Sequence, residues 1–235
     1  RRRHRPRDAL LVMSFARERP PDAARADKSQ EAKGQIVPGA SIDGPLAAGI
    51  PGVPAALEHI AVYYGRLPLA VSLAPAIILA REGFPVDRVY RRMAGFRLEQ
   101  LRRYGAAGEQ FLVDGEVPPE GYRLRQPQLA DTLAAIARDG ARAFYDGDIA
   151  TRLVAAVRAG GGIWTRRDLR DYRVIERPPI VTDYRGHRVV SANLPSSGGI
   201  VLAQMLNMLE VRRPDGLDEA GRVHLLVEIM RRAYA

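Results

Sequence analysis

Glycine and proline divide this chain into short segments, and that division limits the fold more than any other feature. The 235 residues include 22 Gly and 17 Pro. Proline suits the first turn of a helix, and glycine suits the position just after its end. Between these residues, apolar side chains recur every three or four positions, which predicts amphipathic helices. The predicted helices cover residues 51–64, 75–82, 85–104, 127–139, 148–158, a short helix from 165, 198–210 and 218–235.

Fewer segments have the composition of strands. Residues 9–18 form an apolar run without a helix cap, which predicts one strand. Residues 177–193 predict two strands about a turn at 184–186, because valine and isoleucine favour extended backbone. The stretches 19–50 and 105–125 are rich in turn-forming residues and are expected to be loops. The chain is therefore expected to have an α+β fold that is rich in helices.

The net charge of +9 first suggests a nucleic-acid partner. Of the 36 basic residues only Lys28 and Lys33 are lysines, and the arginines occur mostly as pairs close to Asp or Glu. No DNA- or RNA-binding motif accompanies them, so we expect no nucleic-acid partner. Cysteine is absent, which excludes disulfides, thiolate metal ligands and a cysteine nucleophile. No apolar stretch is long enough for a membrane span.

The two ends of the chain have unusual features. Residues 1–8 form an atypical basic start, and residues 9–13 add an apolar run too short for a convincing signal peptide, so the compartment stays unknown. The chain begins with arginine, and the last helix is expected to continue through Ala235 without a stop signal. We therefore expect a chain that is incomplete at both ends and poorly soluble by itself.

The side chains that could carry chemistry give no active site from their spacing alone. The histidines at 4, 59, 187 and 224 lack metal-ligand spacing and are interpreted as structural, so no metal or cofactor is expected. Ser196 and Ser197 precede two glycines, but no nucleophile-elbow motif surrounds them. Their hydroxyls are expected to cap the next helix, whose glycines permit close packing. The glycine-rich stretches 44–52 and 160–162 match neither common nucleotide-binding motif.

Several collinear segments resemble the gamma-glutamyltransferase (gamma-glutamyltranspeptidase) family over residues 9–235. The more specific ones are Arg17-Glu18 with the residues around them and the run Pro195-Ser196-Ser197-Gly198-Gly199. The segments lie at 16–24, 49–54, 64–68, 73–84, 126–133, 143–147, 160–172, 184–186 and 195–207.

This resemblance implies an N-terminal-nucleophile hydrolase with an αββα architecture, of which this chain is a helix-rich, partial large-subunit region. The family cleaves its own precursor, and the new N-terminal threonine of the small subunit takes the gamma-glutamyl group of glutathione as an acyl-enzyme. The free amine of this N-terminal threonine can serve as the base. None of the four threonines here lies in the family's Thr-Thr-His motif. We therefore expect no catalytic residue in this chain, and a missing small subunit as its partner.

The resemblance transfers one binding residue. Arg17 matches the family arginine that holds the alpha-carboxylate of the gamma-glutamyl substrate, and Glu18 is expected to support it. A guanidinium binds a carboxylate through two parallel hydrogen bonds, which lysine cannot reproduce. Two other interpretations remain: a non-catalytic relative that keeps a gamma-glutamyl or amino-acid pocket, and a basic nucleic-acid-associated protein.

Overall fold

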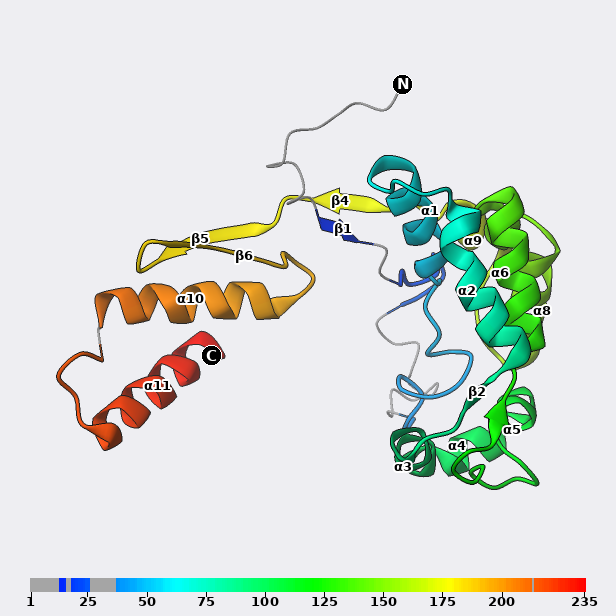
Figure 1. Cartoon of the computed structure of the whole chain (residues 1–235), viewed down its shortest axis with the longest axis horizontal. Coiled ribbons are helices and arrows are strands. Elements are labelled where there is room, and N and C mark those ends of the chain that lie inside the picture. Colours follow the sequence, from blue (N-terminus) through cyan, green and yellow to red (C-terminus); the bar gives the residue numbers. More distant parts are fainter. Residues whose placement is uncertain (1–12, 16–17, 26–36, 213) are drawn as a thin grey trace. The chain divides into compact units, whose positions relative to one another are not determined.

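The computed structural model describes residues 13–15, 18–25, 37–212 and 214–235 (Figure 1). It divides into two compact units. We call Ala16–Val174 the helical unit, and Arg1–Phe15 with Ile175–Ala235 the hairpin unit.

The helical unit contains nine of the described helices and one small strand pair. Its pair, β2 (Phe84–Pro85) and β3 (Arg123–Leu124), is antiparallel. The longest helices, α2 and α6, pack against each other (Figure 1). The helices are α1 (Val53–Tyr63), α2 (Leu69–Glu82), α3 (Arg88–Phe96), α4 (Leu98–Arg103), α5 (Gly105–Phe111), α6 (Pro127–Asp139), α7 (Arg142–Tyr145), α8 (Asp148–Ala159) and α9 (Arg166–Arg170).

An apolar cluster at α7, α8 and α9 forms a core of this unit. Large aromatic side chains fill it, and the residue pattern of each short helix turns its apolar side towards the cluster. The buried members are Ile50, Ala141, Tyr145, Ala150, Val154, Trp164, Leu169 and Tyr172. The loop residue Ile50 therefore packs on the same core as the helices, which fixes the end of the long connection before α1.

The hairpin unit has two strand pairs and two helices. Strand β1 (Met13–Phe15) pairs antiparallel with β4 (Ile175–Arg177), and β5 (Ile180–Tyr184) pairs antiparallel with β6 (His187–Ser191). Helix α10 (Ser197–Val211) packs on the β5–β6 pair and contacts α11 (Glu219–Ala233). Alternate residues of β5 are partly buried, as a strand with one covered face requires.

Most predicted helices are confirmed, including α1, α6, α8, the capped α9 and α10. The start predicted at Pro75 is wrong, because α2 begins at Leu69 and Pro75 lies inside it. Leu73 and Ala80 are buried on either side of this proline. Their packing outweighs the hydrogen bond that the proline removes.

Other boundaries also differ from the predictions. The single helix predicted over 85–104 is divided at Arg97 into α3 and α4, α5 lies within the predicted loop at 105–125, and α7 was not predicted. Both strands around the turn at 184–186 are confirmed, whereas β4 is additional. The last helix ends at Ala233, with Tyr234 as its cap. Of the strand predicted at 9–18, the described part is β1 at 13–15.

The predicted capping of α10 is half correct. Ser196 occupies the cap position, but its hydroxyl makes no capping hydrogen bond. Gly199 is buried, and a Cβ there would collide with the Ala192 carbonyl oxygen, so the prediction of close packing is confirmed at this glycine.

None of the helices in the described ranges combines the length and apolar character needed to cross a bilayer.

Candidate functional site

Arg17, the predicted substrate-binding residue, lies outside the described residues. The segment that follows it directly, residues 18–22, is described and belongs to the helical unit. The contacts of this segment therefore define the scaffold that holds the main chain next to Arg17.

The first contact is a two-way backbone pair between Arg19 and Ile50. The Arg19 amide donates to the Ile50 carbonyl at 3.2 Å, and the Ile50 amide donates back at 2.7 Å. Beside this pair, a Cβ at position 49 would lie 2.9 Å from the Cβ of Glu18. Glycine at 49 therefore lets the two chain segments approach, and Ile50 connects them to the apolar core.

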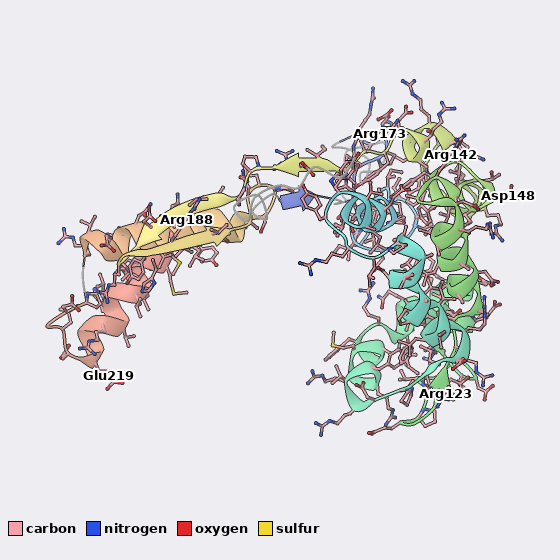
Figure 2. The ribbon with its side chains drawn as sticks, turned by 45° about the horizontal axis from the view of Figure 1, so that its top comes forward. Arg123, Arg142, Asp148, Arg173, Arg188 and Glu219 are labelled. Atoms are coloured by element: carbon pink, nitrogen blue, oxygen red, sulfur yellow. The ribbon has the colours of Figure 1, made fainter. Side chains whose placement is uncertain are left out.

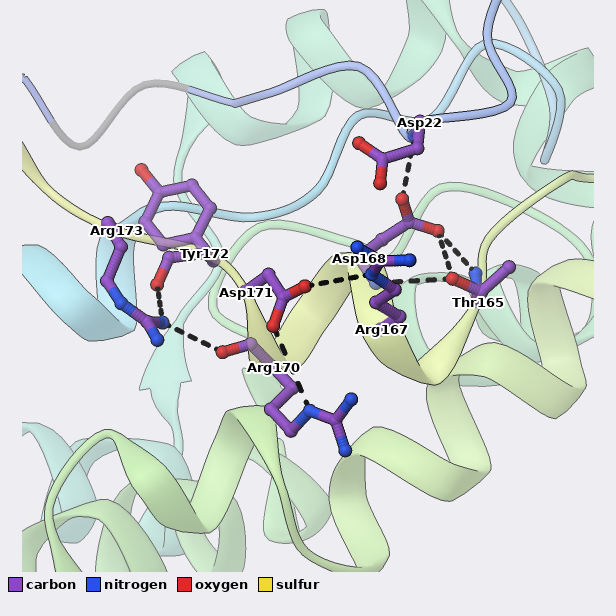
Figure 3. A network of polar contacts seen from close by, with 8 residues as sticks. All are labelled: Asp22, Thr165, Arg167, Asp168, Arg170, Asp171, Tyr172 and Arg173. Atoms are coloured by element: carbon purple, nitrogen blue, oxygen red, sulfur yellow. Dashed lines mark hydrogen bonds and ion pairs between the residues drawn. The ribbon is translucent and has the colours of Figure 1, made fainter.

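The second contact joins Asp22 to α9, 146 residues further along the chain (Figure 3). The Asp22 amide donates to one carboxylate oxygen of Asp168 at 2.7 Å. The other oxygen accepts from the amide and the hydroxyl of Thr165, at 2.7 and 2.6 Å. Thr165 Oγ1 in turn accepts from the Asp168 amide at 3.2 Å, which completes a capping box. Asp168 therefore caps its own helix and also holds the segment that follows Arg17.

The charge state of Asp168 agrees with this network. Its exposure is only 8%. Burial alone would raise the pKa of this carboxyl, but the hydrogen bonds from Asp22 and Thr165 and the nearby Arg167 guanidinium together lower it below its ordinary value. The carboxylate is therefore ionised at neutral pH, and its hydrogen bonds are charge-assisted.

Helix α9, which carries this carboxylate, is held in place by contacts with the core. The neighbours Trp164 and Leu169 are buried in the core, and the indole Nε1 donates to the Ala48 carbonyl at 3.1 Å. On its exposed side, Arg167 donates to Asp171 at 3.1 Å (Figure 3). The helix is short, so these tertiary contacts rather than its own propensity fix its position.

A cavity of about 630 Å³ lies next to this scaffold, between α1, α7 and the end of α9. Its wall includes Tyr145 and Tyr172, whose rings stack with centroids 5.3 Å apart. The Tyr145 hydroxyl donates to the Pro51 carbonyl at 2.7 Å, and burial raises the pKa of both tyrosines. Both side chains are neutral at physiological pH, so they serve as packing groups rather than bases, and the Tyr145 hydroxyl also acts as a hydrogen-bond donor. Arg142 and Arg173, labelled in Figure 2, also line this cavity.

The described histidines lie on separate elements. His59 lies in the cavity wall and its ring centroid is 4.6 Å from that of Tyr63, while His187 and His224 belong to β6 and α11 of the hairpin unit. His4 lies outside the described residues. In the described ranges, no group of three or more His, Cys, Asp or Glu side chains could hold a metal ion.

The sequence did not reveal that Asp22, Gly49 and Asp168 belong to one scaffold. The spacing from Thr165 to Asp168 predicted the capping box, which is confirmed. The tie from Asp168 to Asp22 joins residues far apart in the sequence, so no local pattern indicates it.

Comparison with known proteins covers nearly the whole chain. The family model described as gamma-glutamyltranspeptidase matches residues 5–235. The chain is 38% identical over 225 residues to a glutathione hydrolase proenzyme of Pseudomonas sp. (strain A14), covering 93% of this chain and 38% of that protein. It is 35% identical over 222 residues to the glutathione hydrolase proenzyme of Escherichia coli (strain K12), with the same two shares.

Solved structures give the same result. The gamma-glutamyltranspeptidase of Helicobacter pylori has a TM-score of 0.91 at 34% identity, covering 95% of this chain and 65% of that chain. That of Pseudomonas nitroreducens, complexed with L-DON, has a TM-score of 0.88 at 34% identity, covering 95% and 67%. The predicted α+β fold, part of an N-terminal-nucleophile hydrolase, is confirmed. The chain spans about 38% of the length of these curated relatives, and it belongs to the gamma-glutamyltranspeptidase family.

Proposed function

We propose that this chain is the large-subunit region, residues 9–235, of an enzyme that transfers or hydrolyses the gamma-glutamyl group of glutathione and related compounds. The family match supports this, as do the relatives named glutathione hydrolase proenzymes. The partner in this proposal is a small subunit that carries the nucleophilic threonine. Neither a nucleic acid nor a metal takes part.

The environments of the four threonines in this chain support the proposal that another subunit supplies the nucleophile. Each of the four hydroxyls makes a hydrogen bond within its own unit. Thr132 donates to the Gln128 carbonyl and Thr151 to the Gly147 carbonyl, Thr165 caps α9, and Thr182 donates to Asn207. All four lie inside the chain, where none has the free amine that activates an N-terminal threonine. Their contacts stabilise helices and the hairpin.

In the proposed reaction, the small-subunit threonine attacks the gamma-carbonyl carbon of the donor. The amide bond to the leaving group breaks, and the leaving amine takes a proton. Water or an acceptor amine then cleaves the acyl-enzyme. The contribution of this chain is to bind the donor: Arg17 holds its alpha-carboxylate through two charge-assisted bonds.

The observation that carries the proposal is the family match over residues 5–235, and the contacts of residues 18–22 describe the segment that follows Arg17. The Arg19–Ile50 pair and the Asp22–Asp168 hydrogen bond hold the segment within five residues of this arginine. A side chain that binds substrate needs supporting contacts, because the affinity for the substrate depends on how closely that side chain is held to its binding geometry.

The test replaces Arg17 by lysine in the complete enzyme and follows release from a gamma-glutamyl anilide. Arg17→Lys should raise the donor KM by roughly tenfold or more, because one of two charge-assisted bonds is lost, and the acceptor KM less than about twofold. Arg25→Lys is the matched control, since Arg25 is exposed and lies eight residues further on. An equal change in both KM values would refute the role of Arg17.

The 235-residue chain alone should release no product in the same assay. Release by the chain alone would overturn the proposal that the nucleophile is supplied from elsewhere. If the complete protein binds a gamma-glutamyl compound but never turns it over, the non-catalytic interpretation would be correct.

A further inference from the structure

We propose that helix α3 (Arg88–Phe96) is a membrane-contact surface, which lies on an anionic lipid bilayer with one side in the acyl boundary and another on the headgroups. This inference goes beyond the proposed function and does not rest on it. Within the helical unit, α3 lies at the opposite end from α1 and α9 (Figure 1).

The first observation is that three large apolar side chains of α3 share one exposed side. Val89, Met93 and Phe96 are four and three positions apart, a spacing that places them on the same side of a helix. Their exposed fractions are 55%, 53% and 72%, and none of the nine residues of α3 is buried. A group of large apolar side chains that stays uncovered on one helix side is typical of a binding surface.

The second observation is that a different side of α3 attaches the helix to its unit. Tyr90 and Ala94 are half-buried there, and the Tyr90 hydroxyl donates to the Phe111 carbonyl at 2.9 Å. Arg97, directly after the helix, forms an ion pair with Asp43. These contacts hold α3 in place while its apolar side faces away from the unit.

The third observation is the positive charge beside the apolar side. Arg88, Arg91 and Arg92 are exposed and share a third side of the helix. The N-cap Asp87 is the only acidic residue from 84 to 98. Among the described residues, none of these three arginines forms an ion pair, so their charges are available to an external anion.

A bilayer is the partner that fits both sides of this helix. Anionic headgroups attract arginine, and the adjoining acyl region accepts apolar side chains, so a basic amphipathic helix lies in that interface. The aliphatic stem of arginine can pass along the apolar region while its guanidinium reaches the headgroups. A second copy of α3 would offer the apolar side chains but the same positive charge, so it fits only one side.

The test uses the complete protein and vesicles of equal parts phosphatidylcholine and phosphatidylglycerol, with the bound fraction measured by flotation. Binding should be at least roughly tenfold weaker to vesicles of phosphatidylcholine alone, because the arginines then lose their anionic partners. Raising the salt from about 0.1 M to about 1 M should also weaken it, because salt screens these charges. Equal binding to both kinds of vesicle, or binding to neither, would overturn the proposal.

Two variants locate the contact on α3. Phe96→Ser should lower the partition to the anionic vesicles roughly tenfold, because a large apolar side chain no longer enters the acyl region. Arg92→Gln should lower it roughly fivefold, because one charge near the headgroups is lost. The matched controls, Ile78→Ser on α2 and Arg152→Gln on α8, change exposed side chains away from α3 and should bind as wild type.

The remaining outcomes also decide the proposal. Losses no larger in the α3 variants than in their controls would refute it. Vesicle binding that survives Phe96→Ser, together with a change in oligomeric state in solution, would show that this side contacts another copy of the protein. Unchanged melting temperatures verify that the variants fold, and if Phe96→Ser does not fold, Arg92→Gln and its control decide by the same criteria.

Discussion

At the scale of single residues, Asp168 is a buried charged side chain of the helical unit. Its carboxylate accepts hydrogen bonds from two segments, and these bonds lower its pKa against the opposing effect of burial. A folded-state pKa below the unfolded value means that ionisation stabilises the fold. That stabilisation is present above the unfolded pKa and is lost as the pH falls through the folded pKa.

At low pH, Asp168 should therefore stabilise the fold no more than an asparagine at the same position would. The difference in unfolding free energy between wild type and Asp168→Asn should be constant from pH 7 down to about 5 and shrink below the ordinary aspartate pKa of 3.8. Trp164 is the only tryptophan and is buried in the same core, so its fluorescence reports unfolding at low protein concentration. Two stability curves that stay parallel down to pH 3 would contradict this prediction.

At the scale of elements, close backbone approach determines where α10 lies. Gly199 packs directly on the main chain of Ala192, and the Ser191 hydroxyl oxygen lies 3.1 Å from the place of a Cβ. The adjacent Gly198 has open space, because the nearest atom to a Cβ there would be Ser196 Oγ at 3.9 Å. Two consecutive glycines in one helix thus have different roles.

The two glycines should respond oppositely to alanine. Gly199→Ala should destabilise α10 by about 1–3 kcal/mol through overpacking, whereas Gly198→Ala should stabilise it by about 0.5–1 kcal/mol. Hydrogen exchange of the α10 amides, measured by mass spectrometry, separates the two effects. Equal protection in both variants would show that the approach at Ala192 does not constrain the helix.

At the scale of the whole molecule, both units carry large apolar side chains that their own cores do not cover. These occur on α1, α2 and α3 of the helical unit and on α10 and α11 of the hairpin unit. Among them are Val62, Tyr63, Val71, Leu79, Met93, Phe96, Val211, Val223, Leu226 and Tyr234. Exposed apolar residues that form a contiguous patch are typical of surfaces that bind other protein segments.

The 235-residue chain alone should therefore self-associate at micromolar concentration, as light scattering would show. Replacing Met93 and Phe96 by serine should reduce the association, because 53% and 72% of these side chains are exposed and little packing is lost. Adding the proposed small subunit should reduce it further. A monodisperse chain that melts cooperatively would contradict this prediction.

The local sequence was sufficient for features that depend on neighbours in the chain. Glycine at 140 and 160 ended the predicted helices, and the spacing from Thr165 to Asp168 predicted the capping box, since both act within one turn. The resemblance to a family supplied the fold, which is confirmed, and Arg17, whose role stays a prediction. The helix start at Pro75 was wrong, because burial of Leu73 and Ala80 overrides local preference.

By itself the sequence therefore determined the helix-rich α+β character, most helix positions and the family, because periodicity and motif order are written along the chain. Only the tertiary structure decided that the Asp22 amide binds Asp168 and that glycine at 49 leaves room for Glu18. It also decided that Ile50, whose backbone pairs with Arg19, packs in the apolar core. Those contacts join residues tens to more than a hundred positions apart. Their partners are chosen by how the core packs, and no local pattern encodes that choice.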